Sequence, residues 1–366
     1  ISGRRNDPTR AMTHSAGARS ALLATLLLAD SLPAWSGDIE AGNAVYDANC
    51  AVCHGATGRP DPDSPVVKGL GVVPADLTDA LFNSREPTGD WQMVVKHGGD
   101  AMGLAEQMPA HKETLSDEQV ENVVAYVKSL VDTSAYPPGE MNLFLPIRTK
   151  KAFPEDEVVY HGRMTDNDGE NEYKNILEIE KRVGRAGQLI LELVHEKDAV
   201  TNELTEVEFG YKQALSWSPE YILSGAVVYA LPIDNPNSDG ELQAYFAYGA
   251  SLSDSWIFQG SLRFKMPVDK FSDGEAELAG IAHYVHSDWP RSVFPALEVV
   301  AVQPYRSSNG DLEWTAMPQV RIGLTKGGHV ALNLGVEFPL SDQSWDRRYY
   351  VTLLWDFADG SFFKGW

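Results

Sequence analysis

The sequence is short of basic residues. It carries 30 Lys and Arg against 52 Asp and Glu, which gives a formal net charge of −22. Because phosphate binding depends on clusters of Lys and Arg, and the sequence shows none, nucleic acid is excluded as a partner. The sequence also lacks a nucleophile–base constellation and a phosphate-binding glycine loop. These absences argue against an enzyme in the ordinary sense.

The N-terminal apolar run is too short to cross a membrane. Residues 21–29, ALLATLLLA, are about half of the ~20 residues that a bilayer-spanning helix takes. A small-x-small exit follows at residues 34–36, and Met12 is a plausible start. This order is typical of a secretory signal peptide. We therefore expect residues 1–36 to be upstream residues and a signal peptide, and the mature chain to be exported.

Cysteine is scarce, with two in the whole chain. Cys50 and Cys53 stand in the stretch NCAVCHG, with His54 directly after the second. Two cysteines at this spacing suit a redox pair, half of a zinc site or the two thioether points of a c-type haem. The adjacent histidine favours the haem. In that interpretation the thiols bond to the haem vinyl groups and His54 is one axial ligand of the iron.

Two helices are expected around this motif. Residues 38–49 place Gly42 and Tyr46 four apart on one helix face. Residues 115–130 begin with a natural N-cap, Ser116, and a run of acids in the first turn. The apolar stripe of this second helix consists of Val120, Val123, Val124, Val127 and Leu130.

Residues 37–133 resemble class I cytochrome c. In that family a glycine and an aromatic residue of the first helix pack against an aromatic residue of the last helix, and Gly42, Tyr46 and Tyr126 match these positions. The second axial ligand is a methionine in a Met-Pro loop before the last helix, which Met108-Pro109 matches. The resemblance implies an all-α domain with one covalent haem c.

The resemblance makes Met108 the expected sixth ligand of the iron, with Met102, His111 and His97 as nearby alternatives. His/Met ligation raises the reduction potential and closes the iron to substrates. The chemistry implied is therefore outer-sphere transfer of one electron. Residues 37–133 carry 16 acidic and 6 basic side chains, which form either a solvated surface or one that steers a basic partner.

The pattern changes after this domain. Residues 134–153 contain Pro-Pro-Gly at 137–139 and a further proline at Pro146, which stop the helix and keep the chain extended. We expect a Pro-rich linker there. Residues 154–366 then alternate apolar and polar side chains with a period of two, as in HVALNLGVEFPL at 329–340.

This alternation predicts about 12 strands of ~11 residues, whereas soluble strands average ~5–6 and membrane-crossing strands need ~9–11. The expected strands are 156–163, 173–182, 187–197, 203–214, 220–232, 241–250, 255–267, 275–286, 293–303, 313–325, 328–340 and 347–357. Their connections alternate between short and long, the long ones being 165–172, 197–203, 232–241, 267–275, 304–313 and 341–348. Most tryptophans lie near strand ends. An outer-membrane barrel is typical of this pattern, and a soluble β-sandwich or calycin-like barrel is the alternative.

The C-terminal tail is similar to that of a family of proteobacterial outer-membrane barrels. The matching residues are Leu354-Trp355-Asp356, Asp359-Gly360 and Gly365-Trp366. The resemblance implies an antiparallel transmembrane β-barrel surrounded by outer-membrane lipids, and it brings no agreed activity. By architecture the whole chain also resembles fused cytochrome–porin proteins that oxidise iron(II), although their barrels are larger. This resemblance leaves open a metal (Fe(II)) oxidase that works by electron transfer.

The polar strand face has two interpretations. A barrel of twelve strands is intermediate in width between one that side chains fill and one that leaves an open channel. This face therefore forms either an ion-paired filling or a narrow path for small metal cations. The polar set is Glu178, Glu180, Glu192, Glu206, Glu208, Arg263, Lys265, Arg321, Glu337 and Asp356. The function expected is an outer-membrane-anchored c-type cytochrome with its haem domain in the periplasm. It would pass electrons between periplasmic redox proteins and a donor or acceptor reached through or at the barrel. A diffusion porin with a haem sensor or anchor and a soluble periplasmic two-domain electron carrier are the alternatives.

Overall fold

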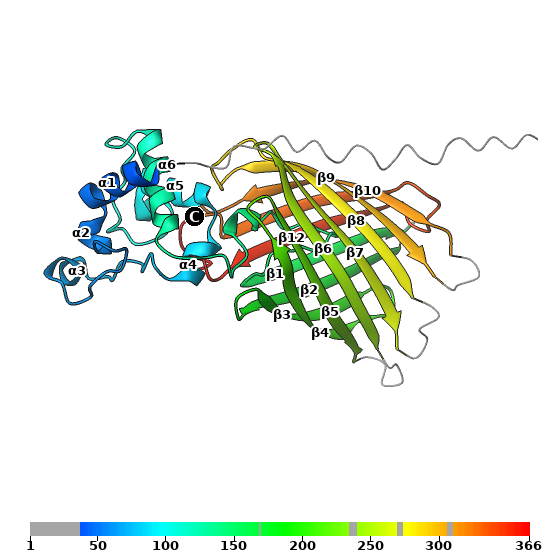
Figure 1. Ribbon diagram of the computed structural model, residues 1–366. Helices are drawn as coiled ribbons and strands as arrows, with labels where there is room; N and C mark the ends of the chain where they lie inside the picture. The colour runs from blue at the N-terminus through cyan, green and yellow to red at the C-terminus, as the bar shows by residue number, and fades with distance from the viewer. Residues whose placement is uncertain (1–36, 168–169, 234–239, 269–273, 306–309) are drawn as a thin grey trace, which may run out of the picture. The chain divides into compact units, whose positions relative to one another are not determined.

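The computed structural model describes residues 37–167, 170–233, 240–268, 274–305 and 310–366 (Figure 1). The expected signal peptide, residues 1–36, lies outside the described residues. So do the middles of four expected long loops, at residues 168–169, 234–239, 269–273 and 306–309. Among the helices described, none is both long and apolar enough to cross a bilayer.

The N-terminal part is all-α. Its helices are α1 (Ile39–Asn49), α2 (Ala51–His54), α3 (Pro65–Leu70), α4 (Ala80–Arg85), α5 (Thr88–Ala101) and α6 (Asp117–Ser129). The sequence pattern predicted α1 and α6 and carried no clear signal for α3, α4 and α5. Asp38 caps α1 by accepting hydrogen bonds from the backbone amides of Glu40 and Ala41. Ser116 and Gln119 form a capping box at α6.

Helices α1 and α6 cross at a glycine. A Cβ on Gly42 would lie 2.0 Å from the carbonyl oxygen of Asn122, so the two backbones touch there. One turn later the rings of Tyr46 and Tyr126 pack with their centroids 5.2 Å apart. The expected packing of Gly42, Tyr46 and Tyr126 is therefore confirmed.

Gly42→Ala should separate these helices. The added methyl group has no space, and overpacking costs ~1–3 kcal/mol of unfolding free energy. A denaturant titration followed by the haem absorbance should show an earlier midpoint for this variant. Gly69→Ala is the matched control, because a Cβ on Gly69 meets nothing within 4 Å. Equal losses in the two variants would contradict a close helix contact at Gly42.

The C-terminal part is a closed antiparallel barrel of 12 strands, in which β1 pairs with β12. The strands are β1 (Glu157–Asn167), β2 (Glu170–Val183), β3 (Gly187–Lys197), β4 (Asn202–Trp217), β5 (Tyr221–Pro232), β6 (Glu241–Ser253), β7 (Trp256–Pro267), β8 (Glu275–Tyr284), β9 (Val293–Pro304), β10 (Glu313–Gly323), β11 (Val330–Pro339) and β12 (Arg347–Asp356). The expected fold class, an all-α domain followed by such a barrel, is confirmed.

Two details of the strand prediction are wrong. Residues 165–172 were expected as a long loop, but β1 and β2 pair as far as Asn167 and Glu170. The strict period of two expected along residues 203–214 also breaks, because a register shift opposite Val194 leaves Thr205 only 6% exposed. A bulge of this kind displaces one residue from the period-two pattern, and the sequence pattern alone does not show it.

The barrel is apolar outside and charged inside. Its outward side chains include Phe209, Val227, Phe246, Leu278 and Leu297, each more than half exposed. Its buried inward side chains include Glu178, Glu180, Glu192, Glu208, Glu277, Glu298 and Glu337. A soluble barrel has the opposite arrangement, whereas a barrel embedded in lipid carries an outward apolar band and a polar interior.

The interior is filled by the chain that enters the barrel. Residues 139–156, here called the lumen segment, begin with η1 (Gly139–Met141) and lead into β1. The expected Pro-rich linker, residues 134–153, overlaps this segment. Strand side chains donate hydrogen bonds to its backbone carbonyl groups, and these pairs include Gln259 to Phe144, Asn333 to Leu145, Ser224 to Ala152 and Lys212 to Phe153.

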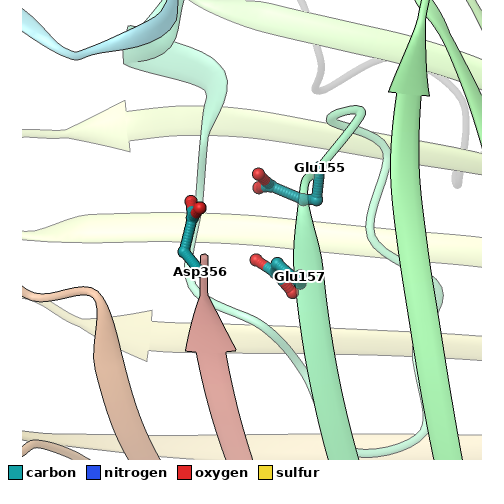
Figure 2. A group of neighbouring side chains, drawn as sticks. All are labelled: Glu155, Glu157 and Asp356. Carbon is teal, nitrogen blue, oxygen red and sulfur yellow. The ribbon is translucent and has the colours of Figure 1, made fainter. Parts of the chain in front are cut away.

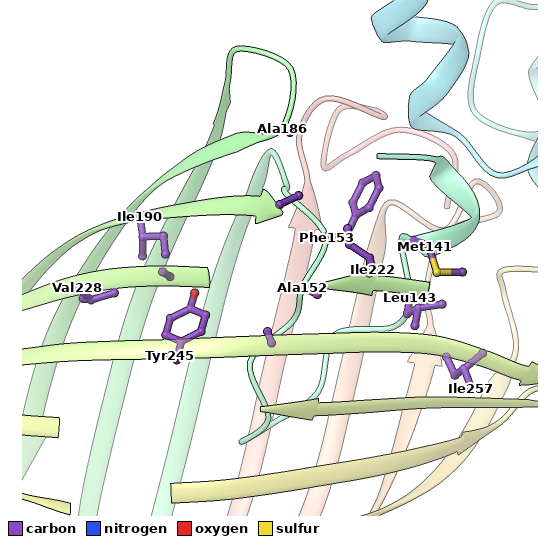
Figure 3. Packing of buried hydrophobic residues seen from close by; sticks show 13 residues of the cluster. Met141, Leu143, Ala152, Phe153, Ala186, Ile190, Ile222, Val228, Tyr245 and Ile257 are labelled. Carbon is purple, nitrogen blue, oxygen red and sulfur yellow. The ribbon is translucent and has the colours of Figure 1, made fainter. Parts of the chain in front are cut away.

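Apolar and charged side chains also hold the lumen segment. Met141, Leu143, Ala152 and Phe153 belong to one buried cluster with barrel residues such as Ile222 (Figure 3). The lumen segment and the inner wall of the barrel therefore share one apolar core.

Arg148 joins this segment to two strands through charged contacts. Its Nη1 lies 2.7 Å from Oε1 of Glu337, and its Nη2 lies 2.5 Å from Oε2 of Glu277. Lys150 lies 3.6 Å from Glu192. Of the two interpretations of the polar strand face, these contacts favour an ion-paired filling.

Candidate haem-binding site

A large apolar cavity lies beside the cysteine pair. Its volume is about 540 Å³, within the ~300–1,000 Å³ typical of ligand pockets. Cys50, Cys53, His54 and Met108 all line it. The apolar wall includes Leu77, Phe82, Trp91, Val95, Val123 and Val127. The predicted site residues therefore come together around one space.

The cysteine motif is a helical turn. Cys50 ends α1, where its amide donates to the carbonyl oxygen of Tyr46 at 2.8 Å, and the amide of His54 donates to the carbonyl oxygen of Cys50 at 3.0 Å. Both thiols are free. Burial, with a smaller contribution from Cys53, raises the pKa of Cys50 to about 11. Redox-active Cys-x-x-Cys pairs have lowered thiol pKa values, so the redox-pair alternative is disfavoured.

A zinc site at these cysteines is not supported either. Among the described residues, the group of metal-ligating side chains that lies close enough together to hold an ion contains no cysteine. A tetrahedral zinc site built on Cys50 and Cys53 needs further cysteine or histidine ligands beside them. The thioether interpretation is the one that remains for this motif.

His54 is oriented by the backbone. Its Nδ1 lies 3.3 Å from the carbonyl oxygen of Ala75, which assigns the proton to Nδ1 and leaves Nε2 as the free ligand atom. Burial lowers the pKa of His54. The imidazole is therefore held neutral, which is the form that ligates a metal.

The candidates for the sixth ligand separate into two groups. Met108, Met102 and His111 line the cavity. Met102 is the most buried of them, with 4% of its surface exposed. His97 packs its ring edge-on against Trp289, with the centroids 5.0 Å apart.

Two glycines hold the methionine loop against α5. Gly98 has a φ of +79°, a conformation that only glycine adopts readily. The amide of Gly99 donates to the carbonyl oxygen of Met108 at 2.9 Å. A Cβ on Gly99 would lie 2.0 Å from the carbonyl oxygen of Ala105. The backbone therefore fixes where Met108 enters the cavity.

Comparisons with known proteins agree with this site. Residues 39–131 match the family model for cytochrome c. Cytochrome c-555 of Prosthecochloris aestuarii is 35% identical over 96 residues, which are 25% of this chain and 85% of that protein. The chain belongs to the cytochrome c family. Cytochrome c-554(547) of Halothiobacillus neapolitanus is 32% identical over 96 residues, covering 26% of this chain and 99% of that protein.

Membership in the family implies a covalently bound haem c and electron transfer. The cytochrome c domain fits that group, because free thiols, a neutral imidazole and methionine side chains face one apolar cavity. When bound, the haem supplies a reversible one-electron couple. The protein fixes its edge through the cysteine turn and excludes water with the apolar wall.

The barrel also has structural neighbours. The NanC porin aligns with a TM-score of 0.43 and 9% identity, covering 54% of this chain and 98% of that one. An outer membrane channel from Pseudomonas putida F1 aligns with a TM-score of 0.42 and 12% identity, covering 58% of this chain and 99% of that one.

Met108 remains the predicted sixth ligand, and substitution tests it against Met102. Met108→Leu keeps the volume and removes the sulfur, so it should abolish the spectroscopic signature of methionine ligation and lower the reduction potential. Met102→Leu is the matched control and should keep both. The reverse pattern would make Met102 the ligand. The measurement is the absorption spectrum of the oxidised protein with a potentiometric titration.

The barrel part completes the cavity wall. Gly327, from the turn between β10 and β11, and Ala358 and Asp359, which follow β12, line the same cavity. Asp359 forms an ion pair with Arg85 of α4. Sequence reasoning missed these residues, because nothing in the tail motif around Asp359 signals a contact with a domain more than 200 positions earlier.

A separate acidic group lies inside the barrel. Glu155, Glu157 and Asp356 bring one carboxylate oxygen each within 4.8 Å of the others, and Figure 2 shows them converging. The ammonium of Lys151 contacts Glu155 and lies 3.3 Å from Glu157. Since this ammonium already pairs with two of the three carboxylates, the group is an ion-pair network rather than a candidate metal site.

Proposed function

We propose that this protein is an outer-membrane-anchored c-type cytochrome. It transfers single electrons between periplasmic redox proteins and a donor or acceptor met at the barrel. One observation carries the proposal: the cavity that Cys50, Cys53 and His54 open into is closed by Gly327 and Asp359 of the barrel part. The redox site and the anchor therefore form one unit.

The side of the membrane on which we place the cytochrome c domain follows from the barrel connections that contact it. Trp289 and Gly327, which lie in the connections after β8 and β10, meet the cytochrome c domain at His97 and at the carbonyl oxygen of Met102. In outer-membrane barrels the short turns are periplasmic. We infer that the haem lies in the periplasm, with outer-membrane lipids around the apolar strand face.

The excess of acids in the cytochrome c domain supports a basic periplasmic redox partner. Steering by opposite charge raises association rates and weakens with salt. Small metal cations such as iron(II) are a second class of electron donor, as in the fused cytochrome–porins that the chain resembles. Each oxidised iron(II) would deliver one electron to the haem.

Fractionation and rapid kinetics test the proposal. The protein should partition with outer membranes and show heat-modifiable gel mobility. Haem absorbance in a stopped-flow instrument should then report reduction by a reduced basic cytochrome, with a rate that falls as salt increases. A protein that stays in the soluble fraction, or a haem that dithionite reduces but no one-electron donor protein does, would contradict the proposal.

A diffusion porin with a haem sensor is the second candidate, favoured by the closed barrel. The lumen segment argues against it, because Arg148 and Lys150 place it among inward carboxylates of several strands. The soluble two-domain carrier is disfavoured by the exposed apolar outer face of the barrel.

A further inference from the structure

Three carboxyl groups meet at the edge of the haem cavity. Glu86 and Asp90 belong to the cytochrome c domain, and Asp359 follows the last strand of the barrel. All three line the cavity. These residues are called the carboxyl cluster below. Because the two parts of the chain contribute to it jointly, neither part contains the whole cluster.

The cluster has more acids than cations. Arg85 forms an ion pair with Asp359, and its Nε lies 3.5 Å from Oε1 of Glu86. Among the described residues, Arg85 is the cation within 4.0 Å of a carboxylate oxygen of the cluster. The ammonium of Lys128 is nearby, but it donates to the carbonyl oxygens of Asn83 and Glu86 at 2.7 and 2.6 Å. Negative charge therefore accumulates at half-buried side chains, with Glu86 25% and Asp359 21% exposed.

This surplus holds protons near neutral pH. Burial, reinforced by Asp359, raises the pKa of Asp90 to about 7, against the opposing charges of Lys128 and Arg321. Burial also raises the pKa of Glu86 well above its usual range, with smaller contributions from Asp359 and Asp90. Further charged groups that face the cluster from the lumen segment and strands are Glu140, Asp156, Asp356 and Arg321.

We propose that the carboxyl cluster takes up one proton when an electron reaches the haem and releases it when the electron leaves. The inference rests on the proposed electron-transfer function and gives it a proton partner. An electron adds one negative charge to the cavity that the cluster lines. Unit charges ~10 Å apart at an effective dielectric constant of ~20 change each other's equilibria about tenfold or somewhat more.

The charge balance of the step is complete. One electron passes from the donor to the iron, which changes from ferric to ferrous. One carboxylate of the cluster binds one proton from periplasmic water, so the net charge of the cavity stays constant. Oxidation by the next carrier reverses both transfers. No bond to iron forms or breaks.

The midpoint potential of the full-length protein, measured in detergent with redox mediators over about pH 5 to 9, tests this coupling. The pKa of the cluster is higher in the reduced state, so the potential should fall with rising pH between the two pKa values and level off outside them. Because the two pKa values differ by about one unit, the total fall across this window should be about 59 mV, the potential equivalent of a tenfold change in a one-electron equilibrium.

Matched variants assign the coupling to the cluster. Asp90→Asn and Glu86→Gln should each shift the pH window, and the double variant should flatten the curve. Asp117→Asn is the control, because Asp117 is an exposed acid paired with Lys96. A flat wild-type curve overturns the proposal. So does a slope that survives the double variant, since another group then titrates.

A second measurement keeps the proposal testable if the double variant fails to bind haem. The redox-difference infrared spectrum of the wild type should gain a protonated-carboxyl C=O band on reduction, and each single variant should weaken or move it. Absence of that band in the wild type overturns the proposal. Failure of the proposed function would be seen differently, because mediators set the potential even when no carrier protein exchanges electrons.

Discussion

Replacing Arg148 by alanine is expected to turn a weakly conducting barrel into an open one. Arg148 ties the lumen segment to β8 through Glu277 and to β11 through Glu337. Removing one partner of a buried ion pair costs ~3–5 kcal/mol, because the other charge stays buried without compensation. The lumen segment should then leave its place for part of the time, and single-channel currents in planar bilayers should rise several-fold.

Arg347→Ala is the matched control for this experiment. Arg347 is an exposed arginine at the start of β12, so its loss removes the same side chain without touching the lumen segment. The control should conduct as weakly as the wild type. High and equal currents in the wild type and both variants would show that the lumen is open, and would favour the diffusion-porin interpretation.

Replacing both cysteines by alanine is expected to abolish covalent haem attachment completely. Cys50 and Cys53 are the only thiols of the chain, so no other side chain can form the thioethers. Peroxidase staining for haem after a denaturing gel should be lost. The barrel should still assemble, because its closure depends on pairing between strands that lie outside the cytochrome c domain.

Val52→Ala is the control for the cysteine variant. Val52 lies between the two cysteines and is 65% exposed, so its loss changes the motif without changing the thioethers. Haem staining should persist in this control, and all three proteins should show heat-modifiable gel mobility. Covalent haem in the double cysteine variant would refute the assignment of the motif, and loss of the barrel would show that its assembly depends on haem.

The sequence alone predicted the parts of this molecule that repeat or carry a rigid motif. Strand bounds such as Gly187–Lys197 followed from the period of two, since lipid outside and charge inside require strict alternation. The haem motif followed from Cys50, Cys53 and His54, because thioether bonds and axial ligation restrict both residue types and spacing. The packing of Gly42 and Tyr46 against the last helix was predicted from the family resemblance.

The lumen segment was not predictable in the same way. Its prolines indicated an extended chain, and no local pattern marked Arg148, Lys150 and Lys151 as residues of the barrel interior. Their burial depends on carboxylates such as Glu277 that lie far away in the sequence. The one available indication was complementary charge, because three basic residues precede a barrel whose inward face is rich in glutamate.

The carboxyl cluster was missed for a related reason. Glu86 follows the short helix α4, Asp90 lies in the first turn of α5, and Asp359 stands in the tail after β12. Only the packing of the barrel turns and tail against the cytochrome c domain brings them to one cavity. Contacts over such distances in the chain leave no local pattern.

The most direct test of the account is electron transfer across sealed and opened outer-membrane vesicles that carry the protein with its long loops outward. A reduced soluble cytochrome, too large for the barrel, is added outside while the haem absorbance is followed. The account predicts no reduction in sealed vesicles and rapid, salt-sensitive reduction after permeabilisation. Reduction in sealed vesicles would contradict a periplasmic haem. No reduction after permeabilisation, with dithionite still effective, would contradict electron exchange with carrier proteins.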